Sequence, residues 1–291
     1  MRALRFARTG RGVVGLAILG FVVAVALFGP FFAPHNPSDI LGAPGSPPSG
    51  GFPLGTDYLG HDVLSRVLWG GRSVLWLSLA ATTLSFTLGM AIGGIAGYSR
   101  SIVDPVLMRL VDVVLSFPPL LLFILVVTSI GNSYPMIIVT IGVILAPGIA
   151  RIVYSATREA SVRGYTEAAI TRGERTSAIL LREILPNILG PLIANLGLTV
   201  TFSVLLVAAA TFLGFGVQPP NANWALMISE NRDFLSLNVW ATVVPAALIA
   251  LLTIGANMVG DAISHTLGRT DRRPVTPTGG IEEIVTPAEL I

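Results

Sequence analysis

The sequence predicts an all-α, polytopic membrane protein with six transmembrane helices. Of its 291 residues, 53% are hydrophobic and only 12% are charged, which is too apolar for an ordinary soluble domain. It contains six runs of about 20 apolar residues, the length that a helix needs to cross roughly 30 Å of hydrocarbon. The alternating pattern of a transmembrane β-barrel is absent, so we expect every span to be helical.

The first run, residues 12–33, follows a short arginine-rich segment, residues 1–11, that we expect to be cytoplasmic. Arginines before an apolar stretch also occur in cleaved signal peptides. The length of the run, its proline-rich exit FFAPHNP and the five later spans favour a retained first transmembrane helix.

Residues 34–72 are predicted to form an external loop with a short helix. The part before residue 56 is rich in Pro, Gly and Ser and predicts no regular element. In the following GTDYLGHDVLSRVLWGG, Thr56 or Asp57 can cap a short helix lying on the membrane surface. Asp62 can pair with Arg66 four residues later on that helix.

The other five spans, residues 73–97, 106–130, 136–154, 188–212 and 239–260, form a predicted membrane core over residues 73–264. Pro118-Pro119, Pro147 and Pro245 interrupt three of them, because proline removes a backbone hydrogen bond and kinks a helix. The small residues 208–211 allow close approach of another helix, from this chain or from a second subunit. Residues 265–291, rich in Pro, Thr and Glu, predict a disordered cytoplasmic tail.

The arginines predict the orientation. All 18 basic residues are arginine, and with the N-terminus inside only Arg66, Arg72 and Arg232 fall outside. Cytoplasmic segments of membrane proteins are enriched in positive charge, so both termini and the segment 155–187 are predicted to be cytoplasmic in a multi-pass protein of the cell membrane. The basic pI then reflects topology and contact with membrane lipid, and we expect no nucleic-acid partner.

The sequence predicts no catalytic residue, no metal site and no cofactor in this chain. It has no cysteine, and His35, His61 and His265 lie on different loops without the spacing of metal ligands. They are interpreted as polar boundary residues. Asp261 ends a span, as a catalytic aspartate of an intramembrane aspartyl protease could. That chemistry needs two carboxylates that share a proton, and Asp112 is the only other candidate, so we do not expect this activity.

The sequence does not decide the roles of three charged residues near the third span. Asp112 lies three residues after Arg109, so the two share a helix face. Such charges near a helix end either anchor the helix at the membrane surface or take part in transmitting a signal. Asp104, just before this span, is open in the same way.

The segment of residues 165–187, YTEAAITRGERTSAILLREILPN, is the most informative. Glu167-Ala168-Ala169 is followed by Gly173 and then by Leu185-Pro186, between two spans. The two alanines allow a short helix to lie flat in a partner's groove, and Gly173 can end it in a left-handed conformation. The alternative is an ordinary amphipathic connector. The spacing resembles the EAA loop of ABC-importer permeases, in which the loop forms a coupling helix docked on the nucleotide-binding subunit.

Three further phrases resemble the same family, in family order, so that the resemblance covers about residues 52–268. GTDYLGHDVLSR is similar to GTDxxGRDxxSR of the C-type permease subunits of dipeptide and oligopeptide importers, with His61 in place of Arg. LGFGVQPPNANWA is similar to LGLGVQPPxPxWG, and GDAISH to the start of GDxLRDxLDP without its charges. The external motif residues are Gly55, Thr56, Asp57, Gly60, Asp62, Ser65 and Arg66.

The resemblance implies a type I ABC importer permease fold in which this chain forms half of a peptide pathway. It implies a second, B-type permease subunit, cytoplasmic ATPase subunits that bind ATP and Mg, an external peptide-binding protein and alternating access. A Walker A loop needs a lysine and this chain has none, so the chain itself is not expected to be an enzyme. Alternatives are a nickel importer of the same family and an ion-driven secondary transporter, although no inverted repeat is visible.

Overall fold

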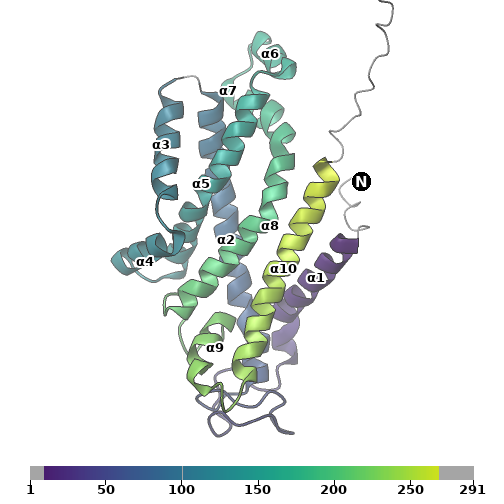
Figure 1. Cartoon of the computed structure of the whole chain (residues 1–291), viewed down its shortest axis with the longest axis vertical. Coiled ribbons are helices and arrows are strands. Elements are labelled where there is room, and N and C mark those ends of the chain that lie inside the picture. The colour runs from purple at the N-terminus through teal and green to yellow at the C-terminus, as the bar shows by residue number, and fades with distance from the viewer. Residues whose placement is uncertain (1–9, 100, 269–291) are drawn as a thin grey trace, which may run out of the picture.

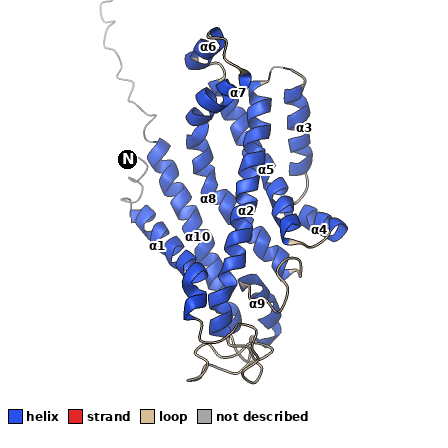
Figure 2. Ribbon diagram, turned by 180° about the vertical axis from the view of Figure 1, so that it is seen from behind, coloured by secondary structure: helices blue, strands red, loops and turns tan. Residues whose placement is uncertain are grey.

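The computed structural model describes residues 10–99 and 101–268, and these form a bundle of long helices without a β-strand (Figures 1 and 2). Residues 1–9 of the predicted cytoplasmic segment and residues 269–291 of the predicted tail lie outside them, as does the side chain of His265. Residues 10 and 11 begin the first helix, and residues 265–268 belong to the last helix and not to a disordered tail. The elements are α1 (Gly10–Phe28), η2 (Gly29–Phe32), α2 (Val63–Tyr98), α3 (Val103–Leu115), α4 (Pro119–Ile130), α5 (Tyr134–Ala160), α6 (Gly164–Thr171), α7 (Thr176–Ala178), η3 (Ile179–Ile184), α8 (Leu185–Phe212), α9 (Trp224–Asn231), η4 (Arg232–Phe234) and α10 (Trp240–Gly268).

Five of these helical segments are long and apolar enough to cross a membrane, and the pair of α3 and α4 adds a sixth if it is counted as one span. The loop of residues 33–62 and α9 lie at one end of the bundle, called here the loop end (Figure 1). Helix α6 lies at the opposite end, the α6 end, toward which the start of α1 and the end of α10 also point. The all-α membrane fold predicted from the sequence is confirmed.

The third predicted span, residues 106–130, is divided into two helices at Pro118-Pro119, where the sequence predicted an interruption. Helix α3 ends at Leu115, and α4 leaves it at an angle of 91°. The cause is the pair Pro118-Pro119, because a residue before proline is disfavoured in helical conformation and proline itself cannot donate a backbone hydrogen bond. Pro119 instead starts α4 in the first helical turn, where its missing N–H is harmless.

The separate short surface helix predicted within residues 34–72 is wrong, because residues 63–72 form the first turns of α2. Asp62 rather than Thr56 or Asp57 caps this 36-residue helix, accepting hydrogen bonds from the backbone of Leu64 and Ser65. The carboxylate of Asp62 is therefore used at the helix start, and the predicted pair between Asp62 and Arg66 does not form. At 1.5 Å per residue, α2 is about 54 Å long and exceeds the thickness of the hydrocarbon core.

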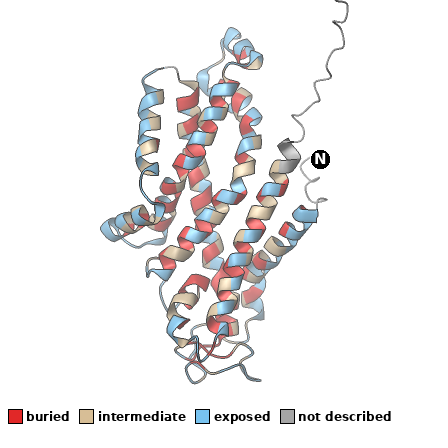
Figure 3. Ribbon diagram, in the orientation of Figure 1, coloured by how far each residue is buried: buried red, intermediate tan, exposed pale blue. Residues whose placement is uncertain are grey.

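The predicted close contact at residues 208–211 is made partly within the chain. Ala210 and Thr211 are buried in the bundle, whereas Ala208 and Ala209 line an open groove beside α4, α9 and α10. Buried residues form stripes where helices face one another, and many apolar residues on the outward faces are exposed (Figure 3). An apolar outer face is what a lipid-facing surface requires.

The most extensive helix contact in the described chain joins α2 to α5. It is lined by Gly89, Gly93 and Gly97, which repeat every four residues and so share one face of α2. A Cβ atom on Gly93 would lie 2.4 Å from the carbonyl oxygen of Ala150, so the two backbones touch directly. Small residues at this spacing permit close helix packing in membranes, where lipid cannot drive helices together by the hydrophobic effect.

Gly93→Ala should destabilise the protein by about 1–3 kcal/mol, because the added methyl group would overlap backbone of α5. Gly94→Ala is the matched control: a Cβ atom there meets nothing within 4 Å. Its higher helix propensity should leave stability unchanged or raise it by up to about 1 kcal/mol. Thermal unfolding of the two purified variants would compare them, and equal melting temperatures would contradict this assignment of the seam.

Candidate functional site

Helix α6 and the turn that follows it form the first candidate site, at the α6 end. The helix begins at Gly164, with Glu167 in its first turn, where a negative charge complements the helix dipole. Its end is a Schellman motif: the N–H of Gly173 donates to the carbonyl of Ile170, and the N–H of Glu174 donates to Ala169. Gly173 has a φ of +73°, as the sequence predicted for a helix-ending glycine.

The two faces of α6 differ. Thr166 and Ala169 are buried, and the Thr166 hydroxyl donates to the Ala160 carbonyl at the end of α5 (2.8 Å). Ala169 packs in an apolar cluster with residues of α5, η3 and α8. Glu167 and Ala168 face outward and are exposed. Ala169 is therefore an internal anchor, and its predicted place on a partner-facing surface is wrong.

Leu185 and Pro186 lie where a π-helical segment, η3, passes into α8. A proline cannot donate to the preceding turn, and its ring clashes with the carbonyl four residues earlier in an α-helix. The wider π turn before Pro186 accommodates it. Next to Gly173, Arg172 forms ion pairs with Glu174 (2.6 Å) and Glu183 (3.4 Å). The pair with Glu183 connects the turn to η3.

The motif GTDYLGHDVLSR forms a second candidate site at the loop end. Its two glycines are required by geometry. Gly55 and Gly60 have φ values of +72° and +93°, and a Cβ atom on either would lie 2.2 Å from a loop carbonyl oxygen. Between them, the Thr56 hydroxyl donates to the Ala43 carbonyl (2.6 Å) and accepts from the Ser46 N–H (2.8 Å). These contacts fold the loop of residues 33–62 back on itself.

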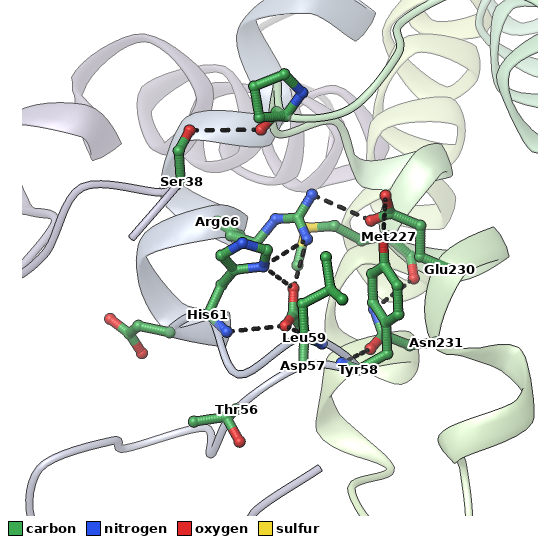
Figure 4. A network of polar contacts seen from close by, with 12 residues as sticks. Ser38, Thr56, Asp57, Tyr58, Leu59, His61, Arg66, Met227, Glu230 and Asn231 are labelled. Atoms are coloured by element: carbon green, nitrogen blue, oxygen red, sulfur yellow. Dashed lines mark hydrogen bonds and ion pairs between the residues drawn. The ribbon is translucent and has the colours of Figure 1, made fainter. Parts of the chain in front are cut away.

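The charged residues of the motif form a buried network (Figure 4). The Asp57 carboxylate pairs with Arg66, and Arg66 reaches on to Glu230 of α9, with its Nη2 3.1 Å from the Glu230 Oε2. That contact is an ion pair without hydrogen-bond alignment, since Oε2 has no hydrogen-bond donor. The Tyr58 hydroxyl donates to the other Glu230 oxygen (3.1 Å). Arg66 is only 1% exposed.

Ser65 and the helix cap form a second branch of the network. The Ser65 hydroxyl donates to Asp62 (2.6 Å), and its oxygen accepts from the backbone N–H of His35 (3.0 Å). The His35 ring contacts the same Asp62 carboxylate at 3.1 Å. The start of α2 is thereby joined to the chain that leaves η2.

The pKa values of the acidic groups in this network shift in different directions. Burial raises the pKa of Glu230, and the nearby Arg66 charge offsets this only in part. Burial also acts to raise the pKa of Asp57, but the Arg66 charge and the hydrogen bonds from Arg66 and His61 outweigh it and hold that pKa below its ordinary value. Burial and the neighbouring Glu230 raise the pKa of Tyr58 to about 12. Two carboxylates thus share one guanidinium.

His61 occupies this network and is not the boundary residue that the sequence suggested. Its ring lies 2.8 Å from Asp57, and its backbone N–H donates to the same carboxylate (2.9 Å). Within the described residues no group of three His, Cys, Asp or Glu side chains could hold a metal ion.

Helix α9 supplies contacts that sequence reasoning missed. Trp224 is fully buried, and its indole N–H donates to the Val67 carbonyl of α2 (2.8 Å). Its ring lies over Gly70 and Gly71, where any Cβ atom would collide with it. Asn231 accepts from the backbone of Tyr58 (2.9 Å). The glycine pair in LWGGR was the available signal, because adjacent glycines within a helix permit a bulky neighbour to approach.

The charges whose role the sequence left open join α3 to α5. Asp104 pairs with Arg158 (2.6 Å), and Asp112 pairs with Arg151. Arg109 shares the helix with Asp112, yet the partner of Asp112 comes from a different helix. The pairs are partly exposed, so each contributes little stability and mainly orients α3.

Comparison with known proteins gives consistent matches. Residues 89–269 match the family described as "Binding-protein-dependent transport system inner membrane component", and residues 2–48 match "N-terminal TM domain of oligopeptide transport permease C". The chain is 34% identical over 90% of its length to the di/tripeptide transport system permease protein DppC of Pseudomonas aeruginosa, covering 89% of that protein. It is 33% identical over 92% of its length to the dipeptide permease protein DppC of Bacillus subtilis, covering 85% of it.

The match to the oligopeptide transport system permease protein OppC of Haemophilus influenzae is 32% identical over 92% of this chain and 87% of that protein. Among solved structures, the chain is similar to one of inward-facing conformations of the MetNI methionine ABC transporter. The TM-score is 0.56 at 20% identity, over 70% of this chain and 96% of the other, which shows a shared fold.

Arg66→Gln should destabilise the protein by about 3–5 kcal/mol, because two buried carboxylates then lack their cation. Without Arg66, both carboxyl pKa values in the folded state lie above their unfolded values, so stability is lost as pH rises through them. The defect should be smallest in acid. Melting temperatures from pH 5 to 8 measure this.

Arg232→Gln is the control, since Arg232 is exposed at the same end and lies 3.7 Å from Asp233. It should melt like the unaltered protein. A pH-independent defect in Arg66→Gln would count against the charge network and in favour of lost packing alone.

Proposed function

The chain belongs to the family of binding-protein-dependent transport system inner membrane components, and from this membership we propose that it is the permease subunit of an ABC importer for di- or oligopeptides. The observation that carries the proposal is the agreement in name among the three relatives given above, each matched over about nine-tenths of the chain and each named as a peptide permease. The fold supports it, since the structural neighbour is an ABC transporter.

The proposed site of coupling to an ATPase is the outward face of α6 with the turn after it. Glu167 and Ala168 are exposed there, Gly173 gives the turn its left-handed geometry, and Leu185 and Pro186 begin the helix behind it. Because the exposed Ala168 is small, this face of α6 can fit into a groove of a partner. On the opposite face, the buried Thr166 and Ala169 attach α6 to the bundle. A force on α6 would therefore reach α5 and α8 directly.

The proposed partners are a second, B-type permease subunit, cytoplasmic ATPase subunits that hold ATP and Mg, and an external peptide-binding protein. The α6 end is proposed to be cytoplasmic, on the ground of the arginine distribution. Cysteine introduced at Ser46 should then react with an impermeant reagent outside intact cells, while cysteine at Ser177 should not. The native chain has no cysteine to interfere.

Transport is the direct test. Alone, the chain should neither hydrolyse ATP nor take up peptide, since it lacks the lysine of a Walker A loop. Reconstituted with the second permease and the ATPase, it should support peptide uptake that requires ATP and the binding protein. Uptake by the chain alone that an ionophore abolishes would establish the secondary transporter instead, and uptake of Ni²⁺ but not peptide would establish the nickel importer.

Coupling is tested first on Ala168, which is exposed, and then on Gly173, which shapes the turn after α6. Ala168→Arg should reduce uptake at least tenfold by blocking the docking face, while Ala168→Ser, which stays small, should transport normally. Gly173→Val imposes backbone strain of about 1–3 kcal/mol, whereas Gly173→Asn is tolerated at positive φ. ATPase co-purification would be measured with uptake, and normal uptake by Ala168→Arg would refute the coupling assignment.

A further inference from the structure

An apolar groove runs between α1, α2, α8 and α10. It has a volume of about 420 Å³ and is lined almost entirely by aliphatic side chains, among them Leu19, Leu79, Leu196, Val200 and Leu252. On both α8 and α10 the lining residues span a stretch of twelve residues, 193–204 and 252–263, with eleven steps between its ends. At 1.5 Å per residue this is about 16 Å, close to half of the roughly 30 Å hydrocarbon core. Gly255 of α10 packs against Leu19 of α1, so the groove continues from there along α1 to Leu27, toward the loop end. It is therefore long enough to hold an extended hydrocarbon chain.

One charged residue, Arg72, lines this groove where it meets Leu27 near the end of α1, a position called here the mouth of the groove. The same residue also lines a second cavity of about 440 Å³ at the loop end, with polar neighbours Asn36, Ser38, Ser73 and Asn221. The two cavities therefore adjoin at one arginine, apolar on the membrane side and polar on the loop side. That division matches an amphipathic ligand with a polar head and a hydrocarbon chain.

Arg72 is held in place without being neutralised. Its Nη2 donates to the Leu27 carbonyl (2.8 Å), and its guanidinium lies over the rings of Phe31 (5.7 Å) and Trp69 (5.6 Å). In the part of the chain that the structure describes, no carboxylate lies within ion-pair distance of it. Aromatic residues at this level are typical of the membrane interface.

We propose that the groove and the polar cavity together bind one phospholipid of the leaflet at the loop end. An acyl chain fills the groove, and the phosphate accepts hydrogen bonds from Arg72, whose planar fork matches phosphate oxygens. A transmembrane helix of another subunit would fill the apolar groove but leave the fixed positive charge against an apolar surface. The charge at the mouth thus favours a lipid over a helix. The proposal is independent of the transported substrate.

The test uses the full chain in its native complex, placed in nanodiscs that contain a photoactivatable phosphatidylglycerol. A diacylglycerol with the same chains and photoreactive group, but without phosphate, is the comparison. Labelling of groove residues, mapped by mass spectrometry, should be roughly tenfold stronger with the phospholipid, as one charge-assisted hydrogen bond supports. Arg72→Gln should remove this preference, and Arg72→Lys should keep part of it.

Two controls accompany the variants. Arg232→Gln removes a different exposed arginine at the loop end and should keep the tenfold preference, and labelling of exposed Leu125 on α4 should be the same in every variant. Equal labelling of the groove by both lipids, or a preference that survives Arg72→Gln, would overturn the proposal. So would crosslinking of a cysteine at Leu79 to a second permease, which would assign the groove to a subunit contact.

Discussion

The contact between α2 and α5 is the constraint on which the other features of this structure depend. Lipid chains are as apolar as the helix surfaces, so the hydrophobic effect does not drive helices together within a membrane. Close van der Waals packing must hold them together instead. Glycines at 89, 93 and 97 bring the two backbones into contact along the seam. Helix α2 begins at the charged motif of the loop end, and α5 ends where Thr166 of α6 is anchored. The seam therefore sets the relative position of both candidate sites.

The loop end is held by charge. A buried arginine is costly unless it is paired, and Arg66 is compensated by Asp57 from its own motif and Glu230 from α9. The result ties the start of α2 to a segment more than 160 residues later in the chain. Burial raises the pKa of Glu230, whereas the charge of Arg66 and the hydrogen bonds from Arg66 and His61 overcome burial and lower the pKa of Asp57. This gives a structural reason for each residue of the motif.

The α6 end is organised differently, with a small docked helix whose inward residues bind it to the bundle. Adjacent alanines have opposite roles there: Ala169 is fully buried, and Ala168 is exposed. The Gly173 turn has a left-handed backbone and is open in space, because a Cβ atom there would meet no atom within 4 Å. This exposed face is the surface proposed above for coupling to an ATPase. The likeness to a solved ABC transporter concerns the fold in which this surface is set.

The sequence by itself determined the features that depend on near neighbours. The lengths of the apolar runs predicted the helices, Gly173 predicted a left-handed helix end, and Pro118-Pro119 marked a break. The α2 glycines were equally visible, since their four-residue spacing is a known packing signal, but sequence reasoning overlooked them. The family phrases predicted the membership that the comparisons confirm.

Only the tertiary structure decided which distant residues meet. A carboxylate four residues before Arg66 looks like its partner, yet Asp62 caps α2, and Arg66 turns to Asp57 and to Glu230 of α9. Asp112 likewise pairs with Arg151 across two helices. The 91° turn after α3 has the same character, because proline fixes where a helix breaks while packing sets the direction. Spacing along a chain restricts local geometry, whereas long-range pairing depends on how whole helices pack.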